Sequence, residues 1–232
     1  MIQGIRLLIA LFVLHPCVVF AETPRDLPAP DVILQRAKEA YAPTCCFHAR
    51  FDQVTVNVSM DFRDKFQGMI YVRKPDMIAL EVETPEKQKV VLKGKAYTVF
   101  FPDEGSAARG EVPSELNVDH FLGFFANIGN VDRNFSVAYA AKPFSEEDGL
   151  YLLELTDPKN PQSTYRVVLG IDPEKYTIKR AVIFDALGNY NRFDLFEITF
   201  VSSLPEHRFS VEYGHQDAVR EKASPGAGSE TK

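Results

Sequence analysis

The sequence predicts a mainly β protein with a few helices, and three observations support this class. Eleven short segments either alternate apolar and polar residues or are apolar throughout, as strands do. Turn signals such as Lys93-Gly94, Leu187-Gly188-Asn189 and Asp172-Pro173 separate several of these segments and are typical of antiparallel neighbours. In Phe66–Pro85 both faces of two adjoining strands are apolar, so the sheet is covered on both sides or lines a cavity.

The predicted strands are spread over most of the chain. We expect them at Phe47–Val58, Lys65–Arg73, Met77–Glu83, Gln88–Leu92, Tyr97–Phe101, Phe135–Ala140, Leu150–Leu155, Thr164–Ile171, Ile178–Asp185, Arg192–Val201 and Arg208–Tyr213.

A cationic break interrupts the apolar stretch Phe66–Pro85. Because strand side chains alternate between faces, Ile70, Val72 and Lys74 share one face, and Tyr71 and Arg73 share the other. On the residues alone, the basic pair before Pro75 is most simply two solvated charges at a strand end.

Two helices are predicted. The first spans Asp31–Tyr41, with Asp31 as the N-cap and Pro43 ending it. The second, Val118–Ile128, has apolar residues at helical spacing, among them Phe121, Leu122 and Phe125. It is either a plug that completes the core or a lid that closes an apolar cavity reversibly.

The N-terminus predicts export. Arg6 precedes the apolar run Leu7–Leu14, and a cleavage site follows at Ala21, so residues 1–21 form a signal peptide and the protein is expected in the periplasm. The alternative, lipidation at Cys17, is disfavoured because His15 and Pro16 replace the small residues that a lipoprotein signal needs. We expect one domain over residues 22–220 and a disordered tail over 221–232.

Composition and motifs exclude several functions. Arg6 is the one charged residue of the signal peptide at neutral pH, so removal of this peptide changes the net charge from −6 to −7. Nucleic acid is an unsuitable partner for a chain with this negative charge. The histidines of the mature chain are scattered without metal-ligand spacing, and nucleophile-elbow, P-loop and dinucleotide motifs are absent. We therefore predict no enzyme, no metal and no cofactor.

The adjacent pair Cys45-Cys46 contains the only cysteines of the mature chain. Three states are open for an exported protein: two buried thiols, a disulfide between the neighbours, or a bond to another chain. A redox enzyme is not supported because the C-x-x-C spacing is missing.

Short motifs recur in a fixed order along the chain: Phe47–Gln53 (F-x-A-x-F-x-Q), Gly68–Pro75 (G-x-L-x-x-K-R-P), Thr84–Glu86, Lys93–Lys95, Tyr97–Phe101, Leu155–Lys159, Asp185–Asn189 and Phe209–Val211. This order resembles the LolA family of periplasmic carriers for outer-membrane lipoproteins. The order and spacing of the motifs, rather than any single motif, carry the resemblance across almost all of the mature chain.

The resemblance implies an unclosed antiparallel β-barrel of about eleven strands, with a helical lid over an apolar cavity. It implies a monomeric carrier of acylated lipoproteins, which it takes from an inner-membrane ATP-driven exporter and passes to an outer-membrane receptor. The expected cavity residues are Ile70, Val72, Ile78, Leu80, Val99 and Phe101, and the expected lid residues are Phe121, Leu122 and Phe125.

The expected lid latch departs from the family pattern. The family has an arginine directly before the proline, where this sequence has Lys74, with Arg73 one place earlier. Arg73 points to the opposite face unless a bulge intervenes, and lysine lacks the planar fork of arginine. This departure leaves two alternatives open: a carrier for another lipid, such as a glycolipid or isoprenoid, and an interaction protein that senses lipoproteins.

Overall fold

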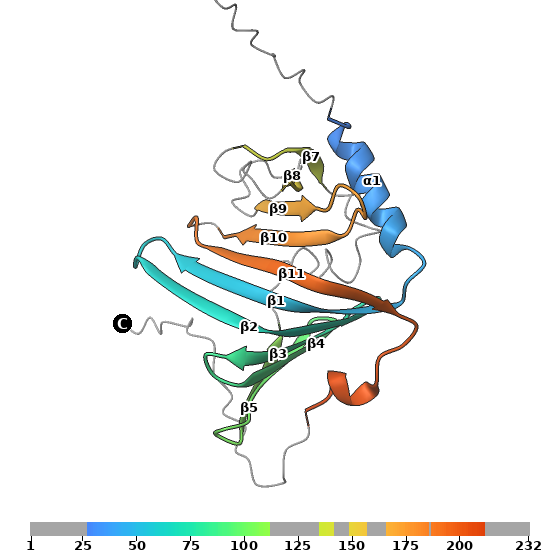
Figure 1. Cartoon of the computed structure of the whole chain (residues 1–232). Coiled ribbons are helices and arrows are strands. Elements are labelled where there is room, and N and C mark those ends of the chain that lie inside the picture. The colour runs from blue at the N-terminus through green and yellow to red at the C-terminus, as the bar shows by residue number, and fades with distance from the viewer. Residues whose placement is uncertain (1–26, 112–134, 142–148, 157–165, 186, 212–232) are drawn as a thin grey trace, which may run out of the picture.

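The computed structural model describes residues 27–111, 135–141, 149–156, 166–185 and 187–211. Within these ranges eleven strands form one antiparallel sheet (Figure 1). The strands are β1 Cys46–Asn57, β2 Phe62–Arg73, β3 Met77–Thr84, β4 Gln88–Lys93, β5 Ala96–Phe101, β6 Ser106–Glu111, β7 Ser136–Tyr139, β8 Tyr151–Thr156, β9 Arg166–Ile171, β10 Ile178–Phe184 and β11 Tyr190–Val201.

The sheet is an open half-barrel. Strands β1 to β6 follow one another on one side, strands β11 back to β7 follow on the other, and β1 pairs with β11 at the centre. Strands β6 and β7 are the two ends of this order, so the sheet is not closed into a barrel. This confirms the predicted mainly β fold and its unclosed antiparallel architecture.

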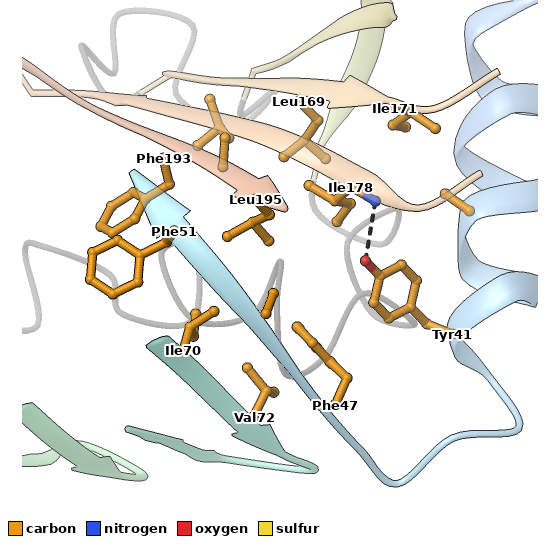
Figure 2. Packing of buried hydrophobic residues seen from close by; sticks show 14 of the residues in the cluster. Tyr41, Phe47, Phe51, Ile70, Val72, Leu169, Ile171, Ile178, Phe193 and Leu195 are labelled. Atoms are coloured by element: carbon orange, nitrogen blue, oxygen red, sulfur yellow. Dashed lines mark hydrogen bonds between the residues drawn. The ribbon is translucent and has the colours of Figure 1, made fainter. Parts of the chain in front are cut away.

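Strand register defines one concave, apolar face. Ile70 pairs with Leu80, Leu80 with Val90, and Val90 with Val99, so these residues lie on the same face of four successive strands. The main core cluster covers this face and extends through Phe51 on β1 to Phe193, Leu195 and Leu169 on the other half of the sheet (Figure 2). The two halves of the sheet therefore share one apolar interior.

A bulge in β11 keeps the concave face of this strand apolar from Phe193 to Phe200. Arg50 pairs with Phe196 and His48 with Thr199, so Glu197 and Ile198 both oppose Ala49. Glu197 has a φ of 52°, the left-handed conformation that such a bulge accommodates. The extra residue changes the parity of the strand, and therefore Ile198 and Phe200, like Leu195, pack against the core.

Helix α1, Pro30–Tyr41, covers one end of the concave face (Figure 1). Its buried residues recur at helical spacing: Ile33, Leu34, Ala37, Lys38 and Tyr41. The predicted N-cap was wrong, because Ala29 occupies that position without a side-chain cap and Asp31 lies in the first turn. Pro30 stands at the first helical position, where its missing N–H costs nothing and its ring favours helical φ.

Two other sequence predictions require correction. The expected strand Arg208–Tyr213 is wrong over its described part, because Glu206–Phe209 forms the 3₁₀ turn η3. Strand β6 was missed because Ser106-Ala-Ala-Arg-Gly-Glu111 has small and polar residues with low strand propensity. The predicted helix Val118–Ile128, with the expected lid residues Phe121, Leu122 and Phe125, lies outside the described residues.

Candidate functional site: a cavity on the concave face

A cavity of about 640 Å³ lies on the concave face at the strand ends farthest from α1. This volume falls within the roughly 300–1,000 Å³ of typical ligand pockets. The cavity is lined by Gln53, Thr55, Val56, Asn57, Phe66, Leu80, Val82, Gln88, Val90, Leu92, Tyr97, Ile183, Phe184, Asp185, Asn189, Tyr190, Asn191 and Phe193. Both halves of the sheet contribute, so the cavity exists only because β1 and β11 pair.

The cavity wall is largely apolar. Phe66, Leu80, Val90 and Tyr97 from successive strands stand on one side, and Phe193 stands on the other. A surface of this kind gains about 25 cal/mol for each Å² of apolar ligand surface that it removes from water. The wall is therefore suited to hydrocarbon chains rather than to ionic ligands.

The structure locates the six predicted cavity residues without testing their role. Leu80 lines the cavity and is 8% exposed. Ile70, Val72 and Ile78 share its face but are more deeply buried, at 2% exposure or less, and do not line the cavity. Val99 is on the same face by its pairing with Val90, and Phe101 follows at the same parity; both are half-buried. Leu80 is thus the predicted residue best placed to contact a ligand.

Several cavity residues were not identified from the sequence. Phe193 and Asn191 come from β11 and reach the site through pairings with β1 that span more than 130 positions of the chain, such as Gln53 with Phe193. Ile183 comes from β10 and pairs with Asn191. The alternation of residues along β1 could have indicated part of the site, because it places Gln53 and Thr55 on the same face as Phe51. The register between β1 and β11 could not be obtained from that alternation alone.

Lys74 joins the sheet to the end of helix α1. Its ammonium group donates a hydrogen bond to the Tyr41 carbonyl, one of the last carbonyls of the helix. Its backbone N–H donates to the Cys45 carbonyl at 2.8 Å. Burial lowers the pKa of Lys74 from its usual value, and the nearby thiols of Cys45 and Cys46 act in the opposite sense. Lys74 is therefore half-buried and holds the helix C-terminus, where a cation is favourable.

Arg73 lies on the opposite, convex face. Its guanidinium donates to the Glu206 carboxylate at 2.6 Å and stands 4.5 Å above the centroid of the Phe209 ring. Arg208 makes a parallel arrangement over the Tyr71 ring at 4.5 Å. These contacts fasten η3 to the back of the sheet. Because the expected lid lies outside the described residues, the latch role of Lys74 and Arg73 stays a prediction.

Aromatic packing fixes α1 at the end of the sheet. The Tyr41 ring meets Phe47 and Phe200 edge-on, at centroid distances of 5.6 and 5.2 Å. The Tyr41 hydroxyl accepts a hydrogen bond from the Ile178 N–H at 3.1 Å (Figure 2). Burial raises the pKa of the Tyr41 phenol above its usual range, although the Ile178 N–H lowers it.

The two cysteines differ in environment. Cys46 is 2% exposed, and burial, together with the neighbouring thiol, raises its pKa to about 11. Cys45 is exposed, so the interpretation of two buried thiols is wrong for this residue. Their sulfur atoms lie 2.6 Å apart beside the C-terminus of α1.

Neither a metal centre nor a membrane-spanning helix is found in the described ranges. They contain no group of three or more His, Cys, Asp or Glu side chains that could hold a metal ion. They also contain no helix with the length and apolarity that a membrane span requires.

The open sheet, the helix across one end and the apolar cavity at the other define a half-barrel protein with its candidate ligand surface on the concave face. A family model described as Outer membrane lipoprotein carrier protein LolA matches residues 44–212. The chain belongs to this family, whose members are carriers.

The relatives are distant in sequence. An outer-membrane lipoprotein carrier protein from Pseudomonas putida strain GB-1 is 20% identical over 179 residues, which cover 77% of this chain and 83% of that protein. An uncharacterized conserved protein from Thermus thermophilus has a TM-score of 0.50 at 10% identity, covering 82% of this chain and 98% of its own. A LolA superfamily protein from Nitrosomonas europaea has a TM-score of 0.42 at 16% identity, covering 80% and 99%. The likeness to the Thermus structure concerns the fold alone.

Proposed function

We propose that the protein is a periplasmic carrier that binds the acyl chains of lipoproteins released from the inner membrane and delivers them to the outer membrane. Its family membership and the apolar cavity of about 640 Å³ support this proposal, and the cavity is the observation that carries it. On this proposal the chain works as a monomer, receives cargo from an ATP-driven exporter in the inner membrane and passes it to an outer-membrane receptor.

Reversible binding is the physical requirement of such a carrier. Each buried methylene of an acyl chain contributes roughly 0.8 kcal/mol, so several long chains in a permanently open pocket would be held too tightly to release. On this proposal Phe121, Leu122 and Phe125 fill the empty cavity and compete with the cargo. Exchange of one apolar contact for another lowers the net affinity while the cargo stays shielded from water.

The proposal is tested by identifying what is bound to the protein purified from periplasm. Mass spectrometry is expected to find triacylated lipoprotein on the wild type and none on Leu80→Glu, because the carboxylate would stand in the cavity wall. Leu187→Glu is the matched control, since Leu187 is 75% exposed and does not line the cavity. Urea unfolding of both variants shows whether either is misfolded. Free lipid without lipoprotein would instead support a carrier of another lipid, and an empty wild type would contradict the proposal.

A further inference from the structure

Three polar side chains form a hydrogen-bonded cluster in the largely apolar cavity wall. Gln53 and Thr55 belong to β1, and Asn191 belongs to β11. The Asn191 Oδ1 accepts hydrogen bonds from the Thr55 hydroxyl at 2.6 Å and from the Gln53 Nε2 at 3.1 Å. The Gln53 Nε2 also donates to the Thr55 Oγ1 at 3.2 Å. All three are half-buried and line the cavity.

At this cluster the side chains of the concave face change from apolar to polar. On β1, the inward residues Phe47, Ala49 and Phe51 near α1 are at most 1% exposed and apolar. Gln53 and Thr55 continue the same face toward the other end, where Thr55 pairs directly with Asn191. A ligand lying along this face would therefore meet polar groups only at the end away from α1.

The internal bonds leave one donor group and one acceptor group for a ligand. They engage the Gln53 Nε2, the Thr55 hydroxyl hydrogen and the Asn191 Oδ1. The Asn191 Nδ2 and the Gln53 Oε1 have no partner within the part of the chain that the structure describes. Reversing both amides would exchange these roles and still leave one N–H₂ donor and one carbonyl acceptor.

The charges around the cavity favour an uncharged ligand group. Asp185 is the one charged residue among the described lining residues. Its carboxylate accepts hydrogen bonds from the backbone N–H groups of Leu187 and Asn189 and from the Asn189 Nδ2, so it is fully engaged in its own turn. No described lining residue is a cation, which a buried phosphate or carboxylate would need.

We propose that Gln53, Thr55 and Asn191 form a subsite for uncharged carbonyl linkages, ester or amide. These are the linkages that join the acyl chains to the rest of the cargo molecule. This inference rests on the proposed function and specifies the cargo chemistry. The Asn191 amide donates to a linkage carbonyl, and the Gln53 carbonyl accepts from an adjacent N–H or hydroxyl. The acyl chains then lie against Phe66, Leu80 and the strands beyond. The subsite selects neutral acylated cargo over anionic phospholipids and free fatty acids.

Binding of defined ligands to the full mature protein tests the subsite. The probes are a dipalmitoylglyceryl-cysteinyl peptide, dipalmitoylglycerol, the dihexadecyl ether of glycerol, which has no carbonyl, and palmitate. The wild type is expected to bind both esters roughly tenfold more tightly than the ether, as one or two neutral hydrogen bonds would give. The peptide should bind best if its amide also reaches Gln53, and the diacylglycerol should match it if the ester alone is recognised; either order supports the subsite.

Matched variants separate the subsite from the rest of the cavity. Asn191→Leu and Thr55→Val should bind ester and ether equally, whereas Gln67→Leu, which replaces an exposed amide that does not line the cavity, should keep the preference. Equal binding of ester and ether by the wild type, or an unchanged preference in both cluster variants, would overturn the subsite and leave the carrier function standing. Failure of the wild type to bind any acyl ligand would overturn both.

Discussion

Replacing Lys74 by leucine should loosen helix α1 from the sheet. The substitution removes the hydrogen bond from the ammonium group to the Tyr41 carbonyl and keeps an apolar side chain in its place. A hydrogen bond from a charged donor contributes roughly 1.5–3 kcal/mol. Part of this is offset because Lys74 is half-buried and its burial lowers its pKa, so the charge itself is costly there. We expect a net loss of about 1–2 kcal/mol in the free energy of unfolding, a sizeable part of the roughly 5–15 kcal/mol of a typical domain.

The loss should be visible in urea unfolding and located by hydrogen exchange. The amides of α1 should exchange faster in Lys74→Leu, while those of β1 and β11 should change no more than the global stability does. Lys74→Arg should recover much of the stability, because a guanidinium can also donate to the carbonyl. Lys93→Leu is the matched control, since its ammonium lies 3.5 Å from the exposed Glu206 carboxylate and should barely move the unfolding midpoint. Wild-type stability and α1 protection in Lys74→Leu would show that the Lys74 ammonium does not hold the helix to the sheet. In a reconstituted handover assay the same variant should also impair cargo release, if Lys74 serves as the lid latch.

Two further substitutions test local features of the half-barrel. Tyr41→Phe should lower the free energy of unfolding by about 1–3 kcal/mol in chemical denaturation, because the Ile178 N–H would remain buried without an acceptor. A loss below about 0.5 kcal/mol, the smallest net contribution of a hydrogen bond, would contradict this. Asp172 accepts hydrogen bonds from the backbone N–H groups of Glu174 and Lys175, both at 2.9 Å. Burial alone would raise the Asp172 pKa, but these N–H groups and nearby lysines lower it below its usual value. The pKa of Asp172 is lower in the folded state than in the unfolded state, so the ionised carboxylate stabilises the fold above the unfolded pKa of about 3.9. This stabilisation is lost as the pH falls through the folded pKa. Asp172→Ala should therefore be less stable than the wild type at pH 7, and the difference should shrink in acid; a constant difference between pH 7 and 2 would argue against this assignment.

The strands were largely predictable from the sequence because each depends on local alternation. That Ile70 and Val72 share one face was visible without a structure, although alternation could not say which face is inward; the register adds Leu80 to that face. Strand β6 was missed because it is an edge strand that needs little apolar surface, and its pairing with β5 supplies what its residues lack. Arg208 and Phe209 look strand-like in sequence, but they make their apolar and aromatic contacts with the back of the sheet.

The candidate site was less predictable than the fold. Its polar cluster joins Gln53 to Asn191 across 138 positions, and that contact depends on the register between β1 and β11. The bulge at Glu197 shifts this register, and no turn or motif in the sequence indicates it. The position of Lys74 shows the same limit: alternation separates it from Arg73, but only the folded chain brings it to the last turn of α1.

Release of a triacylated lipoprotein from inner-membrane vesicles shows whether the concave cavity carries lipoprotein acyl chains. The vesicles, containing the exporter and ATP, are incubated with the purified mature protein, and the soluble fraction is separated by gel filtration. We expect lipoprotein to elute in a soluble complex with the wild type and with Leu187→Glu, and not with Leu80→Glu. Lipoprotein that stays in the membrane whichever variant is added, or a soluble complex that forms equally well with Leu80→Glu, would contradict this role of the cavity.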